Sequence, residues 1–156
     1  MLKPIAYAAL TALLTALAMM PLQAGAQQTT PSGLWKTIDD NSGEPKSLVR
    51  ITESNGEYRG RIEKLFRAAN EDQNPLCDKC EDARRDQPII GMVILTGIRQ
   101  NPQNAAEFTG GQILDPAEGK IYKSKLTLRE DGSKLDMRGY IGVPMLGRTQ
   151  TWLRVE

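Results

Sequence analysis

The sequence predicts an all-β domain, folded as one up-and-down antiparallel barrel of about eight strands. Apolar and polar residues alternate in short segments, which is the period of a half-buried strand. Clusters of Gly, Pro, Asn and Asp separate most of these segments, and no long amphipathic helical pattern is present that could cover an open sheet. Closing the sheet on itself removes its two edges and buries its apolar face. A two-layer sandwich is the competing solution.

The first 26 residues have the pattern of a cleaved secretory signal peptide. Lys3 precedes an apolar run from Ile5 to Leu22, and Ala24 to Ala26 forms an A-x-A cleavage site. An uncleaved anchor helix is the alternative, but Pro21 and several threonines interrupt the run. We therefore expect a periplasmic or secreted protein. Since no Cys stands at the first mature position, we expect no lipid anchor.

The remaining chain is expected to contain a flexible lead, residues 27–32, and one β-domain, residues 33–156. The formal net charge is +1 and both signs are interspersed, so no basic surface of the kind that binds nucleic acid is expected. After residue 26 no apolar run has the length of a membrane span. We expect neither nucleic acid nor a membrane span here.

The first strand, 33–38, ends at a cluster of turn formers from Asp39 to Gly43. A hairpin follows, with strands 46–53 and 57–65 joined at Asn55-Gly56, a pair that favours positive φ. Asn101-Pro102, Pro116, Asp131-Gly132 and the segment 142–147 separate the later strands. These are predicted at 89–98, 107–114, 120–129, 134–141 and 148–155.

Period-two alternation predicts which side chains of these strands face the barrel interior. The interior is expected to be mostly apolar with a few hydroxyl groups, and Gly139 leaves space in it. Val49 and Ile51 share one face of their strand, as do Tyr58, Gly60 and Ile62. The residues predicted to line the interior are Tyr122, Ser124, Leu126, Leu128, Leu135, Met137, Gly139, Ile141, Leu153 and Val155. A solid core and a ligand cavity both fit this pattern.

Residues 66–88 form the one long connection. We expect a short helical turn at 81–86 and a role for the connection as a lid over one barrel mouth. The only two cysteines, Cys77 and Cys80, lie in it. In an oxidising compartment a local disulfide is favoured. Redox chemistry and zinc binding are the alternatives, but the loop lacks a thioredoxin-like framework and the chain has no His to complete a tetrahedral site.

The absence of His also removes Ser-His-Asp and Cys-His catalysis. No pair of acidic residues has a spacing that brings two carboxylates into one apolar site, and no phosphate-binding glycine loop is present. We assign no catalytic residue, no cofactor and no metal ion.

Gly33-Leu34-Trp35 resembles the G-x-W signature of lipocalins. In that family the indole packs at the closed end of the barrel beneath an arginine from the end of the chain. The resemblance implies that Gly33 and Trp35 are structural residues and that Arg154 or Arg148 supplies the guanidinium. An ordinary core tryptophan is the alternative.

The chain from 33 to 156 also resembles the DUF2147 family of exported bacterial proteins. The resemblance is carried, in order, by segments 88–92, 113–116, 119–122, 139–142 and 147–152, which read PIIGM, ILDP, GKIY, GYIG and GRTQTW. It implies a lipocalin-like, calycin-type barrel for which small-molecule binding is usually proposed.

We predict an exported protein that binds a small, largely apolar ligand; the alternative is a protein-interaction or structural envelope module with a solid barrel core. Arg148 with Tyr140 is expected to hold any polar group of the ligand. The apolar segment 143–146 is expected to fold inward as a plug; the alternative is an exposed tip that contacts a ligand, a partner or a membrane. The full set of predicted ligand-binding residues is Tyr58, Tyr122, Ser124, Arg138, Tyr140 and Arg148. Neither the ligand nor the oligomeric state follows from the sequence.

Overall fold

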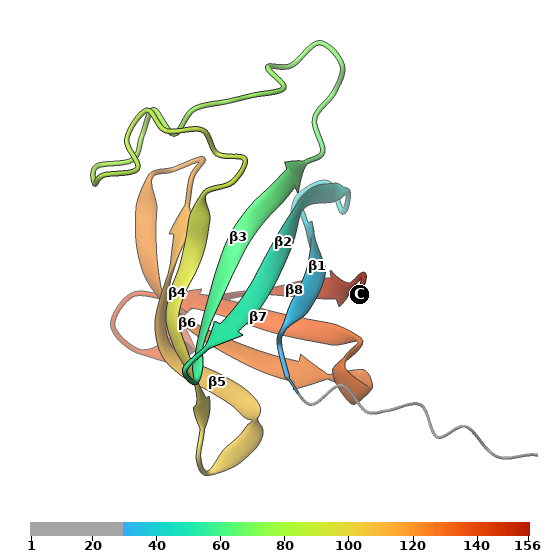
Figure 1. Cartoon of the computed structure of the whole chain (residues 1–156), viewed down its shortest axis with the longest axis vertical. Helices are drawn as coiled ribbons and strands as arrows, with labels where there is room; N and C mark the ends of the chain where they lie inside the picture. The colour runs from blue at the N-terminus through green and yellow to red at the C-terminus, as the bar shows by residue number, and fades with distance from the viewer. Residues whose placement is uncertain (1–29) are drawn as a thin grey trace, which may run out of the picture.

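The computed structural model describes residues 30–156, so the predicted signal peptide lies outside the described residues. Eight antiparallel strands form a closed barrel in which each strand pairs with the next and β8 pairs with β1 (Figure 1). This confirms the barrel and excludes the sandwich. The strands are β1 Gly33–Ile38, β2 Pro45–Ser54, β3 Glu57–Leu65, β4 Val93–Asn101, β5 Asn104–Asp115, β6 Lys120–Arg129, β7 Lys134–Tyr140 and β8 Arg148–Arg154; the 3-10 turns η1 Glu130–Gly132 and η2 Pro144–Leu146 flank β7.

The β2–β3 hairpin forms as the Asn-Gly pair predicts. Asn55 and Gly56 both have positive φ, 53° and 76°, which matches the twist of the flanking strands. Along β3, Gly60 and Ile62 are buried. Gly60 admits a close neighbour, because a Cβ built there would lie 2.9 Å from Cβ of Leu95 on β4. The missing side chain of Gly60 therefore lets Leu95 of β4 pack closely against β3 in the interior.

One strand begins later than predicted. β4 starts at Val93, while residues 89–92 form a turn beside β3. Gly91 has a φ of +90°, and its amide donates to the carbonyl of Ile62 at 2.7 Å. The backbone there is in the left-handed region, which ends the ladder although the sequence stays apolar.

The predicted interior face of the last strand is wrong. Leu153 and Val155 are 37% and 50% exposed, whereas Trp152 is 1% exposed and pairs with buried Leu135 of β7. The register with β7 turns the large indole inward and therefore turns its neighbours outward. Ile141, also predicted inside, is 70% exposed because β7 ends at Tyr140.

The two ends of the barrel differ. At one end lie the β2–β3 and β4–β5 hairpins and η1; at the other lie the β1–β2, β5–β6 and β7–β8 connections and the long segment 66–92, drawn in green to yellow at the top of Figure 1. Fully buried side chains fill the interior toward the hairpin end. They include Trp35, Val49, Ile51, Leu95, Ile98, Phe108, Leu126 and Leu135.

Candidate ligand-binding site

A cavity of about 940 Å³ opens at the end of the barrel that carries the long segment. Its wall is apolar where it enters the barrel, and every strand contributes to it or to its rim. The apolar wall consists of Ile62, Leu65, Ile89, Ile94, Ile113, Leu114, Met137 and Trp152. This volume lies in the range of small-molecule sites. The structure therefore lacks the solid barrel core that the alternative hypothesis, an interaction or structural envelope module, requires.

A small polar area interrupts the apolar wall. The hydroxyls of Thr37 on β1 and Ser47 on β2 lie 2.7 Å apart, and both residues are buried. Trp152 follows on β8, the other neighbour of β1. Its Nε1 is buried and has no hydrogen-bond partner within residues 30–156. A buried donor without an acceptor is costly unless an occupant supplies one.

The rim carries charges of both signs. Lys46, Arg67 and Arg148 face Asp72, Asp78, Asp115 and Glu118 around the mouth. Arg148 forms an ion pair with Asp40, which also accepts a hydrogen bond from Gln150 at 3.0 Å. The two signs nearly balance, so the mouth presents no strong field to select an ion.

Tyr122 connects the wall to the rim. Its hydroxyl donates to a carboxylate oxygen of Glu118 at 3.4 Å. Burial raises the pKa of the phenol, and the neighbouring Glu118 charge raises it further. The phenol is therefore protonated at neutral pH and can donate a hydrogen bond at the mouth.

The long segment forms one side of the mouth. Arg67, Asp72, Pro75, Leu76 and Asp78 line the cavity. The predicted short helix at 81–86 is replaced by hydrogen-bonded turns, with Asp86 at a φ of +57°. A positive φ and the following Pro88 do not continue a helix. The Arg84 guanidinium lowers the pKa of Asp82 to about 2 by hydrogen bonding, and this pair fixes the turn.

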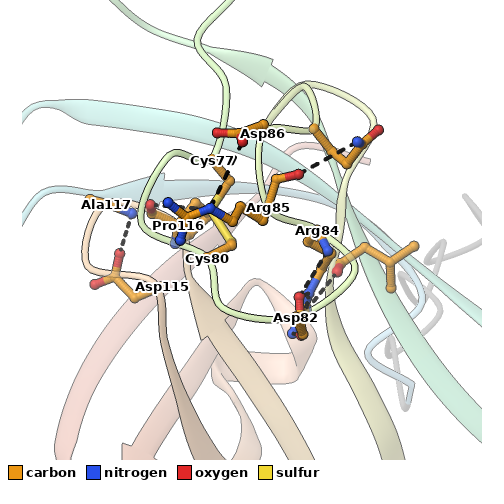
Figure 2. The surroundings of a disulfide bond; sticks show 11 residues. Cys77, Cys80, Asp82, Arg84, Arg85, Asp86, Asp115, Pro116 and Ala117 are labelled. Atoms are coloured by element: carbon orange, nitrogen blue, oxygen red, sulfur yellow. Dashed lines mark hydrogen bonds and ion pairs between the residues drawn. A yellow bond between two sulfur atoms is a disulfide. The ribbon is translucent and has the colours of Figure 1, made fainter.

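Cys77 and Cys80 form a disulfide, as predicted (Figure 2). Both residues are 0% exposed. Figure 2 places the bond beside the β5–β6 turn, where Sγ of Cys77 lies 3.5 Å from the carbonyl oxygen of Pro116. Gly119 in the same turn leaves no room for a side chain, because a Cβ there would lie 1.9 Å from the carbonyl oxygen of Lys79. The disulfide thus fastens the long segment against the mouth, and it leaves no thiolate for a metal ion.

The predicted ligand-binding residues divide into two groups. Tyr122, Tyr140 and Arg148 line the cavity. Tyr58 lies in the filled half, where its ring meets Phe108 edge to face at 5.1 Å. Ser124 is fully buried outside the cavity lining, and its Oγ has no partner within residues 30–156. The sixth residue, Arg138 on β7, supports the β7–β8 loop.

Arg138 holds the β7–β8 loop in place through three hydrogen bonds. It donates from Nε to Pro144 O at 2.5 Å, from Nη2 to Met145 O at 3.2 Å and from Nη1 to Oγ1 of Thr149 at 2.6 Å. The loop points outward, with Met145 and Leu146 87% and 81% exposed. The expected plug is therefore wrong, because these carbonyl contacts fix the backbone at the rim.

At the hairpin end Arg154 is the arginine that stacks on Trp35, with Cζ 4.2 Å from the ring centroid. It also donates to the carbonyls of Gly132, Ser32 and Thr30 at 2.6 to 2.7 Å. Trp35 donates to Pro31 O at 2.8 Å. Residues 30–32 of the predicted lead thus lie against this end of the barrel. Burial at this site lowers the pKa of Arg154.

Sequence reasoning missed several wall residues. Thr37 and Ser47 gave no signal, since they lie near the ends of two strands whose polar residues look solvent-facing. Trp152 lies in the segment GRTQTW, but alternation placed its neighbours Leu153 and Val155 in the interior instead. A signal was available for Trp152: an isolated tryptophan between threonine and leucine is better placed inside a barrel than its neighbours.

A closed eight-stranded antiparallel barrel, filled at one end and hollow at the other, is the architecture of the lipocalin class. In agreement, the fold is similar to that of protein HP1028 from Helicobacter pylori, which is described as belonging to the lipocalin family. The two share 19% identity at a TM-score of 0.69, over 81% of this chain and 84% of that chain. Residues 33–154 match the family described as "Uncharacterized protein conserved in bacteria (DUF2147)". The chain belongs to the DUF2147 family.

A search of curated proteins gave no match. In residues 30–156 no helix has the length and hydropathy needed to cross a membrane. The disulfide fits a location outside the reducing cytoplasm, and the family is bacterial.

Proposed function

We propose that this protein is exported and binds a small, largely apolar ligand inside its barrel. The observation that carries this proposal is the cavity of about 940 Å³, whose deeper wall consists of aliphatic side chains and one indole. Burying apolar surface there supplies the driving force for binding. Export is supported by the signal-peptide pattern of residues 1–26 and by the disulfide.

The polar groups of the wall refine the ligand class. The unpartnered Nε1 of Trp152 and the hydroxyls of Thr37 and Ser47 are neutral groups, and the cations of the mouth stand at the rim. A charged group carried deep into the barrel would lose its hydration without gaining a counterion. The proposed ligand is therefore an apolar molecule without charge inside the barrel, and any charge it has stays at the rim near Arg148 and Tyr140.

The experiment has two parts. Native mass spectrometry of protein purified from its own host is expected to show a retained small molecule. N-phenyl-1-naphthylamine, a neutral apolar fluorophore, is then titrated into delipidated protein and into Gly139→Leu. Gly139 lines the cavity, and a Cβ there meets Tyr122 only at an ordinary 3.5 Å, so leucine fills space without a backbone clash.

We expect Gly139→Leu to weaken fluorophore binding at least tenfold. The matched control is Gln103→Leu, which adds an exposed leucine at the β4–β5 connection, at the opposite end of the barrel. Equal binding by both variants, or no binding by the unmodified protein, contradicts the proposal.

A further inference from the structure

We propose that the β7–β8 loop docks this barrel on the surface of an anionic lipid bilayer. The docking tip comprises residues 141–146. Four of its six residues have large apolar side chains, and all four are exposed: Ile141 is 70% exposed, Val143 54%, Met145 87% and Leu146 81%. Exposed apolar side chains gathered at one tip mark an interaction site.

The tip is held outward by its own backbone contacts. Arg138 fixes the carbonyls of Pro144 and Met145 from below, and η2 closes the loop through the amide of Gly147, which donates to Pro144 O at 3.1 Å. Gly147 fits against β7 so closely that a Cβ there would lie 2.5 Å from the carbonyl oxygen of Gly139. The apolar side chains cannot turn into the barrel without breaking these contacts.

The base of the tip is positively charged. Arg138 donates only to carbonyl and hydroxyl oxygens, so no carboxylate neutralises it among the residues that the structure describes. Lys123 lies on the neighbouring strand β6, opposite Tyr140 of β7 in register. It is exposed and forms no salt bridge within residues 30–156. An apolar tip above cations matches apolar lipid chains beneath anionic headgroups.

The size of the tip favours lipid over a protein partner. Four side chains on a six-residue loop form a convex point, whereas a stable protein interface buries roughly 1,200 Å² or more in total. Insertion between lipid headgroups needs only such a point. Ile141, Leu146 and Gly147 also line the cavity, so a docked tip brings the mouth to the bilayer. Docking itself needs no ligand in the cavity and does not depend on the proposed function.

Cosedimentation with vesicles tests this inference. The purified protein is mixed at low salt with phosphatidylglycerol–phosphatidylcholine vesicles and with pure phosphatidylcholine vesicles. Met145→Glu combined with Leu146→Glu places two carboxylates on the tip. The matched control is Leu153→Glu with Val155→Glu, which adds the same charge at exposed apolar side chains at the hairpin end of the barrel, away from the tip. All variants are prepared with the same N-terminus, so a difference in vesicle binding between them is caused by the substituted side chains.

We expect the unmodified protein to bind the anionic vesicles at least tenfold more tightly than the tip variant, and the control to stay within threefold of the unmodified protein. Lys123→Gln should weaken binding to anionic vesicles only. Circular dichroism and thermal unfolding verify that both double variants fold. Equal loss in both variants, equal binding to both vesicle types, or no vesicle binding overturns the proposal. So does concentration-dependent self-association that the tip variant abolishes, since the tip would then bind a second copy.

Discussion

The two ends of this barrel use the same two residue types to opposite effect. At the filled end Trp35 donates to a buried carbonyl and lies under Arg154, which itself donates to three carbonyls. At the hollow end Trp152 has no acceptor within residues 30–156, and Arg138 holds a loop away from the barrel. The indole of Trp35 is thus satisfied by the fold, whereas the indole of Trp152 is not. The contacts of Trp35 and Arg154 thus stabilise one end, and the cavity of the proposed function lies at the other.

The largest expected difference in unfolding free energy is between a variant that lacks Arg154 and a variant that lacks Arg138. Arg154→Ala should lower the free energy of unfolding by about 3 kcal/mol, since it removes charge-assisted hydrogen bonds and a cation–π contact at a part-buried site. Arg138→Ala should cost less than about 1 kcal/mol, because the loop it holds is exposed. Urea unfolding followed by circular dichroism measures both.

Hydrogen exchange locates the effect of Arg138→Ala within the molecule. In Arg138→Ala the amides of Leu146 and Gly147, which close η2, should exchange faster while the strand amides keep their protection. Equal losses of unfolding free energy in the two variants would show that both ends carry the fold.

The strands were predictable because alternation is a local signal, and its failures have physical causes. Ile89 to Met92 is as apolar as a strand, but Gly91 uses a positive φ that no hydropathy pattern reports. In β8 Trp152 and Leu153 are adjacent and both apolar, so either register satisfies alternation. Only the pairing of Trp152 with Leu135 across the sheet decides between them.

The candidate site was predictable only where one strand determines it. Tyr122 follows from alternation within β6, and it lines the cavity. Thr37 and Ser47 become neighbours of Trp152 only when β8 closes on β1, which is a contact between the two ends of the sequence. The outward direction of the β7–β8 loop depends on Arg138 contacting carbonyls, and no residue pattern encodes such contacts.

The second prediction concerns the disulfide at the hollow end. Replacing both Cys77 and Cys80 by Ala should lower the free energy of unfolding by about 2 kcal/mol, the chain-entropy value for so short a loop. The barrel should persist, because the disulfide fastens the mouth and lies outside the strand ladder. Affinity for N-phenyl-1-naphthylamine should fall, since Leu76 and Asp78 beside the disulfide line the cavity. Global unfolding in the double variant would instead show that the barrel requires the disulfide.

The smallest expected effect is the most selective, because Trp→Phe removes the same atoms at both ends. Trp35→Phe leaves the carbonyl of buried Pro31 without its donor and should cost about 1 to 2 kcal/mol more than Trp152→Phe, which removes a donor that has no acceptor within residues 30–156. Urea unfolding of the two delipidated variants measures the difference. Equal costs in the delipidated proteins would mean that the fold already satisfies both indoles, and the distinction between a self-satisfied end and a binding end would be lost.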